Sequence, residues 1–225
     1  MSSSSSSSSS AAAAPAASAS SASEIPTGFE SALDRASAGR QIIVILDKAA
    51  LETVKTKKGD FQLLNCDDHV NIMKKNNKDP AQYRPDIVHQ ELMAVLDSPL
   101  NKAGKVKVYI HTEKHVLIEV SPKCRIPRTF KRFSGLMVQL LHRLKIRSAD
   151  GADMLLKIIK SPISRHLPPG ARCFGMSHKG DLYNPTHFVH TEVPDDAPIV
   201  LIFGAMATGS IDVADHPYVG LIIIL

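Results

Sequence analysis

Continuous apolar runs are the strongest pattern in this chain, and two of them predict buried strands. Residues 41–47 (QIIVILD) and 198–203 (PIVLIF) are rich in branched aliphatic side chains and show no polar alternation. This is typical of strands that are covered on both faces. Shorter runs predict further strands at residues 106–111, 115–120, 171–176 and 187–193.

Segments that read as helices alternate with these runs. They cover residues 63–75, 86–96 and 150–160, and Ser98-Pro99 ends the second of them. Buried strands that alternate with helices predict an α/β domain with a largely parallel sheet. Ligands bind at the carboxyl ends of the strands in such sheets, so the glycine-bracketed segment 204–209 is the expected small-ligand site.

A basic stretch at residues 121–148 contains eight Lys and Arg residues and no Asp or Glu. Pro127 suits the first position of a helix, because its missing N–H has no partner there. From Pro127 onward, helical spacing separates an apolar stripe from a basic side. The stripe holds Phe133, Met137, Leu140, Leu141 and Leu144, and the other side holds Arg128, Arg132, Gln139 and Arg143. Surface helices usually mix charges of both signs. The absence of acidic residues therefore favours a binding site for a polyanion and not simply a solvated helix face.

Composition agrees with that interpretation. The chain has 225 residues, 44% of them hydrophobic, with a net charge of +5 and a pI near 9.1, which favours nucleic acid or another polyanion as partner. The Ser/Ala-rich residues 1–38 predict a disordered tail before one domain at 39–225. No apolar run approaches the length of a membrane helix. The three cysteines form no C-x-x-C pair, so neither a disulfide framework nor a cysteine zinc site is indicated.

Two local motifs leave alternatives open. Gly204 and Gly209 have the spacing of a phosphate-binding loop, but Ser210-Ile211 follows in place of Lys and Ser/Thr, so the segment is a tight turn or a pocket for an adenine ring or a thioether. Arg84-Pro85-Asp86 opens a helix, either with Asp86 as a cap or with an arginine and a carboxylate held together near a ligand. The residues alone favour the cap.

The ten histidines do not cluster at metal-binding spacing. His187 and His190 are three residues apart in an expected strand, which places them on opposite faces. No metal site is predicted.

Three segments together resemble a known family. They are RPDIVHQELMAVLDSPLNKAG (84–104), VYIHTEKHVLIEVSPKCRIPRTFKRFSGLMVQLLHRL (108–144) and VLIFGAMATG (200–209). They are similar to the eukaryotic small-subunit ribosomal RNA methyltransferases that act on N1 of a pseudouridine, enzymes of the SPOUT or α/β-knot class. The likeness runs from about residue 42 to residue 212.

The resemblance implies a cofactor, S-adenosyl-L-methionine, and a substrate, 18S ribosomal RNA in the small-subunit precursor. It also implies a homodimer in the nucleus and nucleolus. Arg84 and Asp86 match the family's catalytic pair. Arg84 matches the arginine that contacts the substrate, and Asp86 matches the acid that orients this arginine or serves as the base. The other matching positions bind RNA, at Arg125, Arg128 and Arg132, or the cofactor, at Ser177, Gly204 and Gly209.

The chain departs from the family pattern after about Asp212, where it continues to ADHPYVGLIIIL. The family has a Tyr-Pro-Leu-Ser motif and a final helix in this region. We therefore expect a C-terminally truncated domain with an incomplete knot. Two functions remain open at this stage: an RNA methyltransferase, and a non-catalytic RNA-binding factor in small-subunit assembly.

Overall fold

The computed structural model describes residues 41–56, 59–194 and 197–225. The predicted disordered tail and its boundary at residue 38 lie outside the described residues. None of the helices in the described part of the chain is long and apolar enough to cross a membrane.

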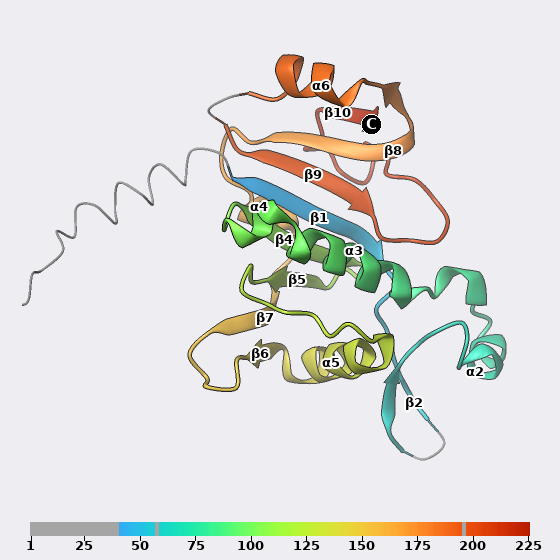
Figure 1. Ribbon diagram of the computed structural model, residues 1–225. Helices are drawn as coiled ribbons and strands as arrows, with labels where there is room; N and C mark the ends of the chain where they lie inside the picture. The colour runs from blue at the N-terminus through green and yellow to red at the C-terminus, as the bar shows by residue number, and fades with distance from the viewer. Residues whose placement is uncertain (1–40, 57–58, 195–196) are drawn as a thin grey trace, which may run out of the picture.

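The core of the fold is an eight-stranded sheet with the order β10-β8-β9-β1-β4-β5-β7-β6 (Figure 1). Five neighbouring strands are parallel: β10 (Leu221–Ile224), β8 (Arg172–Leu182), β9 (Ile199–Gly204), β1 (Ile42–Ala49) and β4 (Val106–Thr112). Three antiparallel strands complete it: β5 (Leu117–Val120), β7 (Met154–Ile159) and β6 (Lys145–Arg147). The predicted α/β class with a largely parallel sheet is confirmed.

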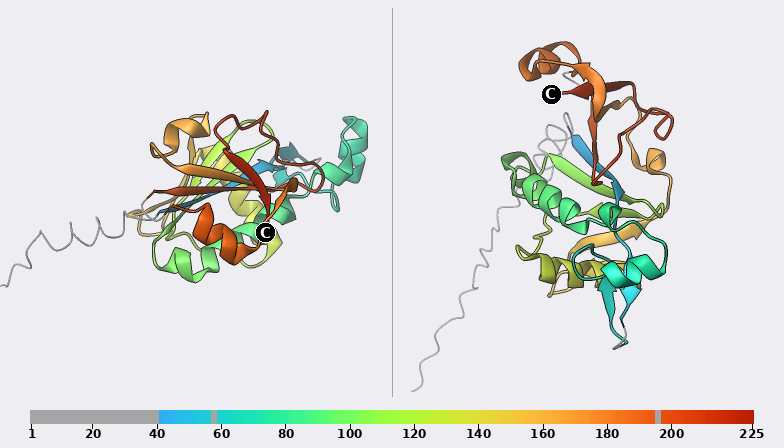
Figure 2. Two further views of the ribbon diagram at one scale, coloured as in Figure 1. Left: turned by 90° about the horizontal axis from the view of Figure 1, so that it is seen from above. Right: turned by 90° about the vertical axis from the view of Figure 1, so that its right-hand side faces the viewer.

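Most of the helices lie on one face of the sheet, as the left view of Figure 2 shows. The two longest, α3 (Pro85–Asp97) and α5 (Phe130–Arg143), pack on the face that carries Val44 and Leu46. The same face carries α6 (Pro185–Thr191), and α4 (Pro99–Lys102) follows α3. Ile43 and Ile45 point to the opposite face, where the 3-10 turn η2 (Ile163–His166) and residues from the C-terminal segment pack.

A small antiparallel hairpin of β2 (Thr53–Lys55) and β3 (Phe61–Leu63) projects from the body beside α5 (Figures 1 and 2). It is followed by α2 (Val70–Lys75) and the 3-10 turn η1 (Pro80–Gln82). The helix predicted over 63–75 is therefore wrong in its first half, because residue 63 pairs with residue 53 in the hairpin.

Two other predicted elements have the wrong type. The helix predicted over 150–160 is strand β7, because its apolar residues pair in register with β5, Leu156 with Val120 and Ile158 with Ile118. The strand predicted over 187–193 is helix α6. Its start is fixed by the Asn184 side chain, which accepts hydrogen bonds from the backbone N–H groups of residues 186 and 187.

The C-terminal segment ends as an edge strand. After Gly209 the chain turns and β10 runs parallel to β8, so close to it that a Cβ atom on Gly180 would lie 2.6 Å from the Ile222 backbone. No helix follows α6 in the described residues. The incomplete knot stays a prediction.

Candidate functional site

Arg84 and Asp86 form a two-bonded ion pair at the start of α3. Arg84 Nε donates to Asp86 Oδ1 at 2.9 Å, and Arg84 Nη2 donates to Asp86 Oδ2 at 2.7 Å. Pro85 occupies the first helical position, and Arg84 is the N-cap residue without a side-chain cap bond. The capping role that the residues alone favoured for Asp86 is wrong, because its carboxylate is turned back onto the guanidinium.

The pair lies near the surface, with 44% of the Arg84 side chain and 37% of the Asp86 side chain exposed. The hydrogen bonds from Arg84 lower the pKa of Asp86, and partial burial only partly opposes them. The same bonds raise the pKa of the guanidinium. Asp86 is therefore ionised at neutral pH and can accept a hydrogen bond from a ligand without first losing a proton.

His89 connects this pair to the basic segment. It lies three residues after Asp86 on α3, is almost fully buried, and donates from Nε2 to the Pro127 carbonyl oxygen at 2.7 Å. Its ring stacks on Phe133 of α5, with 4.6 Å between centroids. The sequence analysis did not single out His89. Its place four residues after Pro85, on the buried stripe of α3, is the signal that was available.

The basic segment is extended at first and helical afterwards. The helix start predicted at Pro127 is wrong: α5 begins at Phe130 with Thr129 as N-cap, because the Pro127 carbonyl bonds to His89. The predicted apolar stripe is confirmed at Phe133, Met137 and Leu140, which are buried, while Leu141 is half-buried. Leu144 does not belong to the stripe, since it ends the helix at φ 64° with 57% of its surface exposed.

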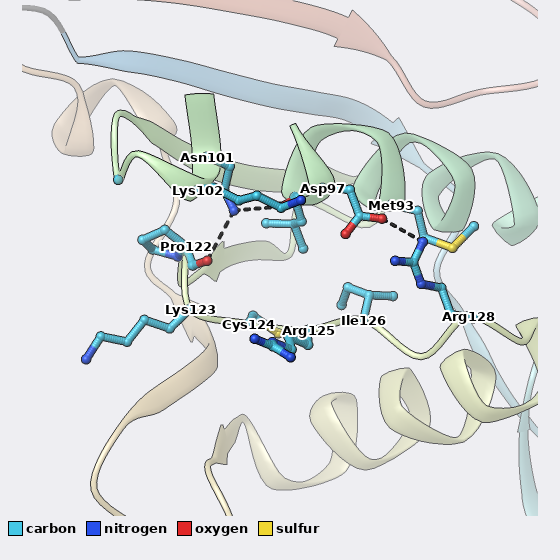
Figure 3. A pocket seen from close by; sticks show the side chains of 12 residues that line it. Met93, Asp97, Asn101, Lys102, Pro122, Lys123, Cys124, Arg125, Ile126 and Arg128 are labelled. Carbon is cyan, nitrogen blue, oxygen red and sulfur yellow. Dashed lines mark hydrogen bonds and ion pairs between the residues drawn. The ribbon is translucent and has the colours of Figure 1, made fainter. Parts of the chain in front are cut away.

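Arg125 and Arg128 line a cavity of about 830 Å³ between the extended segment and helices α3 and α4 (Figure 3). Lys102 and Lys123 add two further cations to its wall. Asn101 fixes that wall by donating from Nδ2 to the carbonyl oxygens of residues 96 and 122. This is a concave cationic surface. The basic helix side predicted from the sequence is only partly present, because Arg128 precedes α5, whereas Arg132, Gln139 and Arg143 are exposed on it.

Carboxylates from other elements reach this surface, which the sequence pattern could not reveal. Arg128 Nη1 lies 2.6 Å from Asp97 Oδ2 at the end of α3, and Lys123 Nζ lies 3.0 Å from Asp153 Oδ1. All four side chains are largely exposed, so each pair is weak and exchangeable. Arg132 lies on the exposed side of α5, outside the residues that line the cavity.

Two of the predicted cofactor residues lie at the same level of neighbouring strands. Gly175 of β8 pairs with Ile202 of β9, so Ser177 and Gly204 each lie two residues further on, Ser177 in the middle of β8 and Gly204 at the carboxyl end of β9. The Ser177 Oγ atom is buried and has no hydrogen-bond partner within the described part of the chain. An orphaned buried hydroxyl of this kind suits a polar group of a ligand.

Met206 lies across the glycines of the loop. A Cβ atom on Gly204 would be 2.7 Å from Met206 Cε, and one on Gly209 would be 3.1 Å from Met206 Sδ. Gly209 also has φ 122°, a conformation that favours glycine. The loop is thus a tight turn packed against its own Met206 side chain, and the cofactor role of Gly204 and Gly209 stays a prediction.

A buried carboxylate at the end of β1 anchors the C-terminal segment, and the sequence analysis missed it. Burial would raise the pKa of Asp47, but hydrogen bonds from His111 Nδ1 at 2.6 Å and His216 Nε2 at 2.8 Å hold it well below the usual range. Tyr218 donates to His216 Nδ1 at 2.8 Å, and Lys48 pairs with an exposed acid of the same segment. The residues after Asp212 are therefore tied to the sheet.

The described residues contain no group of three or more His, Cys, Asp and Glu side chains arranged to hold a metal ion. His187 and His190 lie three apart on helix α6, so the prediction that they face opposite sides of a strand is wrong. Cys66, Cys124 and Cys173 are free thiols.

Comparison with known proteins agrees with this geometry. The sequence model of a family described as EMG1/NEP1 methyltransferase matches residues 44–223. The human ribosomal RNA small subunit methyltransferase NEP1 is 53% identical over 175 residues, which cover 78% of this chain and 70% of that protein. The corresponding Schizosaccharomyces pombe protein, mra1, is 54% identical over 179 residues, 78% of this chain and 50% of that protein.

A solved structure has the same fold. The crystal structure of Archaeoglobus fulgidus Nep1 bound to S-adenosylhomocysteine superposes with a TM-score of 0.67 at 24% identity, covering 82% of this chain and 88% of that chain. The fold is that of the α/β-knot methyltransferases. The chain belongs to the EMG1/NEP1 methyltransferase family. The family match extends to residue 223, further than the likeness to about residue 212 found in the sequence, and the C-terminally truncated domain stays a prediction.

Proposed function

We propose that this protein transfers a methyl group from S-adenosyl-L-methionine to N1 of a pseudouridine in 18S ribosomal RNA during small-subunit assembly. The observation that carries the proposal is the Arg84–Asp86 pair at the start of α3, the helix that His89 joins to the arginine-rich segment. The human and fission yeast relatives are named as ribosomal RNA small subunit methyltransferases, which supports the substrate class.

Ser177 in the middle of β8 and the glycine loop after β9 fit the cofactor. Ser177 offers an unpaired buried hydroxyl, and Gly204 and Gly209 allow close approach to their backbone. The archaeal structure with the same fold holds S-adenosylhomocysteine, the product that remains after methyl transfer. When bound, S-adenosyl-L-methionine supplies an electrophilic methyl group.

The acceptor base meets Arg84 and Asp86. The ionised Asp86 carboxylate has lone pairs beyond those used by Arg84, and these can accept the N1–H of the base. The low pKa of this carboxylate makes it a hydrogen-bond acceptor that orients the N1–H and guides the proton, more than a strong base. Nε and Nη2 of Arg84 are engaged with Asp86, so Nη1 is left to stabilise negative charge on the base as the proton departs.

Arg125, Arg128 and Arg132 hold the RNA backbone in this proposal. All three are exposed, and breaking the weak Arg128–Asp97 pair releases Arg128 for a phosphate. We also propose that the protein works as a homodimer in the nucleolus, as the family likeness implies. Sedimentation analysis and imaging of a tagged protein test these two points.

The experiment that tests the function is incubation of the protein with methyl-labelled S-adenosyl-L-methionine and an 18S ribosomal RNA transcript that carries pseudouridine. Label on the RNA supports the proposal. A second candidate, an RNA-binding assembly factor that transfers no methyl group, requires only the exposed arginines Arg125, Arg128 and Arg132. Tight RNA binding without label would favour that candidate.

A further inference from the structure

A second concave surface lies on the other side of α5, where the helix faces the β2–β3 hairpin. The cavity has a volume of about 440 Å³. We call it the hairpin pocket, and it is lined by residues of β3 and the following turn (Phe61, Gln62, Leu63, Asn65, Asp68, His69) and by one side of α5 (Phe130, Lys131, Ser134, Gly135, Val138). None of the residues assigned above to the cofactor or to the catalytic pair lines it.

An exposed aromatic ring forms one wall of the hairpin pocket. Phe61 keeps 48% of its surface exposed although it lies on a strand. Its ring meets the edge of the His142 ring of α5, with 4.4 Å between centroids and 65° between planes. This contact fixes the orientation of the Phe61 ring and leaves part of it open to solvent, a geometry that suits stacking of a flat ligand.

The opposite wall is open and cationic. Lys131 is exposed and lines the hairpin pocket, and a Cβ atom on Gly135 would contact nothing within 4 Å. Arg132 does not line the hairpin pocket, but it lies three residues before Gly135 and is therefore its neighbour on the surface of α5. The basic side of α5 thus begins beside the hairpin pocket.

Polar groups at the base of the hairpin pocket are held in place by one another. His69 Nε2 lies 3.0 Å from Gln62 Oε1, and Asn65 Nδ2 donates to Asp68 Oδ2 at 3.3 Å. The Asp68 carboxylate has further lone pairs that can accept N–H groups from the edge of a base. Among the described residues that line the hairpin pocket, Asp68 is the only acidic one, and it is unfavourable for a phosphate, so the phosphates belong with Lys131 and Arg132.

We propose that the hairpin pocket binds one unpaired nucleobase of the RNA substrate, with Phe61 as the stacking surface and Lys131 and Arg132 holding the flanking backbone. The inference rests on the proposed function, since it names a contact of the same RNA. An aromatic platform beside a cationic track is how proteins hold single-stranded RNA, because every base has a flat face and every linkage a negative charge.

The test compares two substitutions of Phe61 for binding of a single-stranded RNA oligonucleotide from the 18S substrate region. Phe61→Leu keeps apolar volume and loses the ring, whereas Phe61→Tyr keeps the ring. We expect Leu to weaken binding by about 5- to 150-fold, the equivalent of about 1–3 kcal/mol for one stacked base, and Tyr to bind as the parent does. The salt dependence of binding should be unchanged in both, because no phosphate contact is lost.

A spectroscopic variant guards against a folding artefact. The chain contains no Trp, so Phe61→Trp introduces a single indole that reports on this position alone. We expect the RNA to quench its emission, and thermal melting to verify that each variant is folded.

The outcomes separate the two proposals. If the parent protein binds the RNA with a steep salt dependence while the folded Leu variant binds equally well and the indole is not quenched, the hairpin pocket is excluded and the proposed function stands. If the parent protein does not bind the RNA at all, both proposals are contradicted.

Discussion

The guanidinium of Arg84 and the carboxylate of Asp86 face each other across Pro85 through two hydrogen bonds of 2.9 and 2.7 Å. Pro85 makes this possible because it begins α3 at a fixed φ and leaves Arg84 outside the helix. A bidentate pair of this kind fixes the direction of both groups more strictly than a single contact does. It presents one charged acceptor and one cationic donor to a ligand at a single point.

The Asp86→Asn variant should lose methyl transfer and keep RNA binding. Asn retains one oxygen and the side-chain volume, but it replaces the charged acceptor with a neutral amide and breaks one bond to Arg84. Guided proton removal contributes about 10²- to 10⁴-fold, so we expect transfer to fall by about 100-fold or more, with RNA affinity changed less than threefold. Single-turnover transfer and filter binding measure the two quantities.

Asp97→Asn is the matched control on the same helix. It also neutralises an exposed carboxylate paired with an arginine, but the arginine is Arg128 in the RNA surface. This variant should transfer methyl groups normally and bind RNA equally well or more tightly. Full turnover by a stable Asp86→Asn variant would contradict a catalytic role for Asp86 and leave it only a structural one.

Replacing Arg128 and Arg132 together with Glu should weaken RNA binding strongly. The slope of log affinity against log salt should become shallower by about 0.7 for each phosphate contact that is lost. Titrations at four salt concentrations measure it. Lys160→Glu with Arg165→Glu, at two exposed positions outside the linings of both pockets, makes the same change in net charge and is the control for charge alone. An unchanged slope in the folded double variant would remove these arginines from the RNA surface.

The sequence predicts those elements whose pattern is local. The runs that become β1 and β9 are apolar without interruption, and the helix from residue 86 to 96 has an apolar stripe and a Ser-Pro stop. Residues 150–160 mislead because charges at their ends match a helix dipole, while pairing with β5 makes them a strand. Tertiary pairing overrides such weak local preferences.

The contacts of the candidate site also fall into two groups, those between residues close in the sequence and those between residues far apart. The Arg84–Asp86 pair spans two residues, so its possibility is visible in the sequence. The bond between Asp47 and His216 joins residues 169 positions apart, and the contact between His89 and Pro127 joins residues 38 apart. Neither leaves a local pattern, because chain topology alone brings these groups together.

Asp47 gives a prediction for stability. Asp47→Asn removes a buried charge that accepts hydrogen bonds from two imidazoles, and bonds to charged groups contribute about 1.5–3 kcal/mol each. We expect the free energy of unfolding to fall by about 2–3 kcal/mol, measured by urea denaturation. Asp215→Asn, which breaks the more exposed pair with Lys48, should cost less than about 1 kcal/mol.

The contribution of Asp47 to folding stability should decrease in acid. The folded pKa of Asp47 lies below its ordinary value of 3.8, so its stabilising effect is present above about pH 4 and is lost as the pH falls further. The difference in stability between the parent and Asp47→Asn should shrink in acid. Equal loss in both Asp variants at neutral pH would contradict the anchoring role.

Glu91 predicts the opposite dependence of folding stability on pH. Burial raises its pKa from 4.5 to about 7, and its Oε2 atom is buried without a hydrogen-bond partner in the described residues. A folded pKa above the unfolded one means that stability is greatest below about pH 4.5 and declines as the pH rises to 7.

Glu91→Gln should therefore melt at a higher temperature than the parent at pH 8 and at a similar temperature at pH 4. The side chain is partly exposed, so we expect a gain of about 1 kcal/mol at pH 8, or about 2–4 °C. Differential scanning fluorimetry at both pH values measures it. The same melting difference at both values would show that the charge is not the cause.

The most direct measurement of the central claim is methyl transfer to two synthetic RNA oligonucleotides that differ only in the target base. One carries pseudouridine, whose N1 bears a hydrogen, and the other carries uridine, whose N1 is bonded to the ribose. Mass spectrometry after incubation with S-adenosyl-L-methionine detects the added methyl group. The account predicts one methyl group on the pseudouridine RNA and none on the uridine RNA. Equal modification of both, or none of either by protein that binds the RNA, would contradict it.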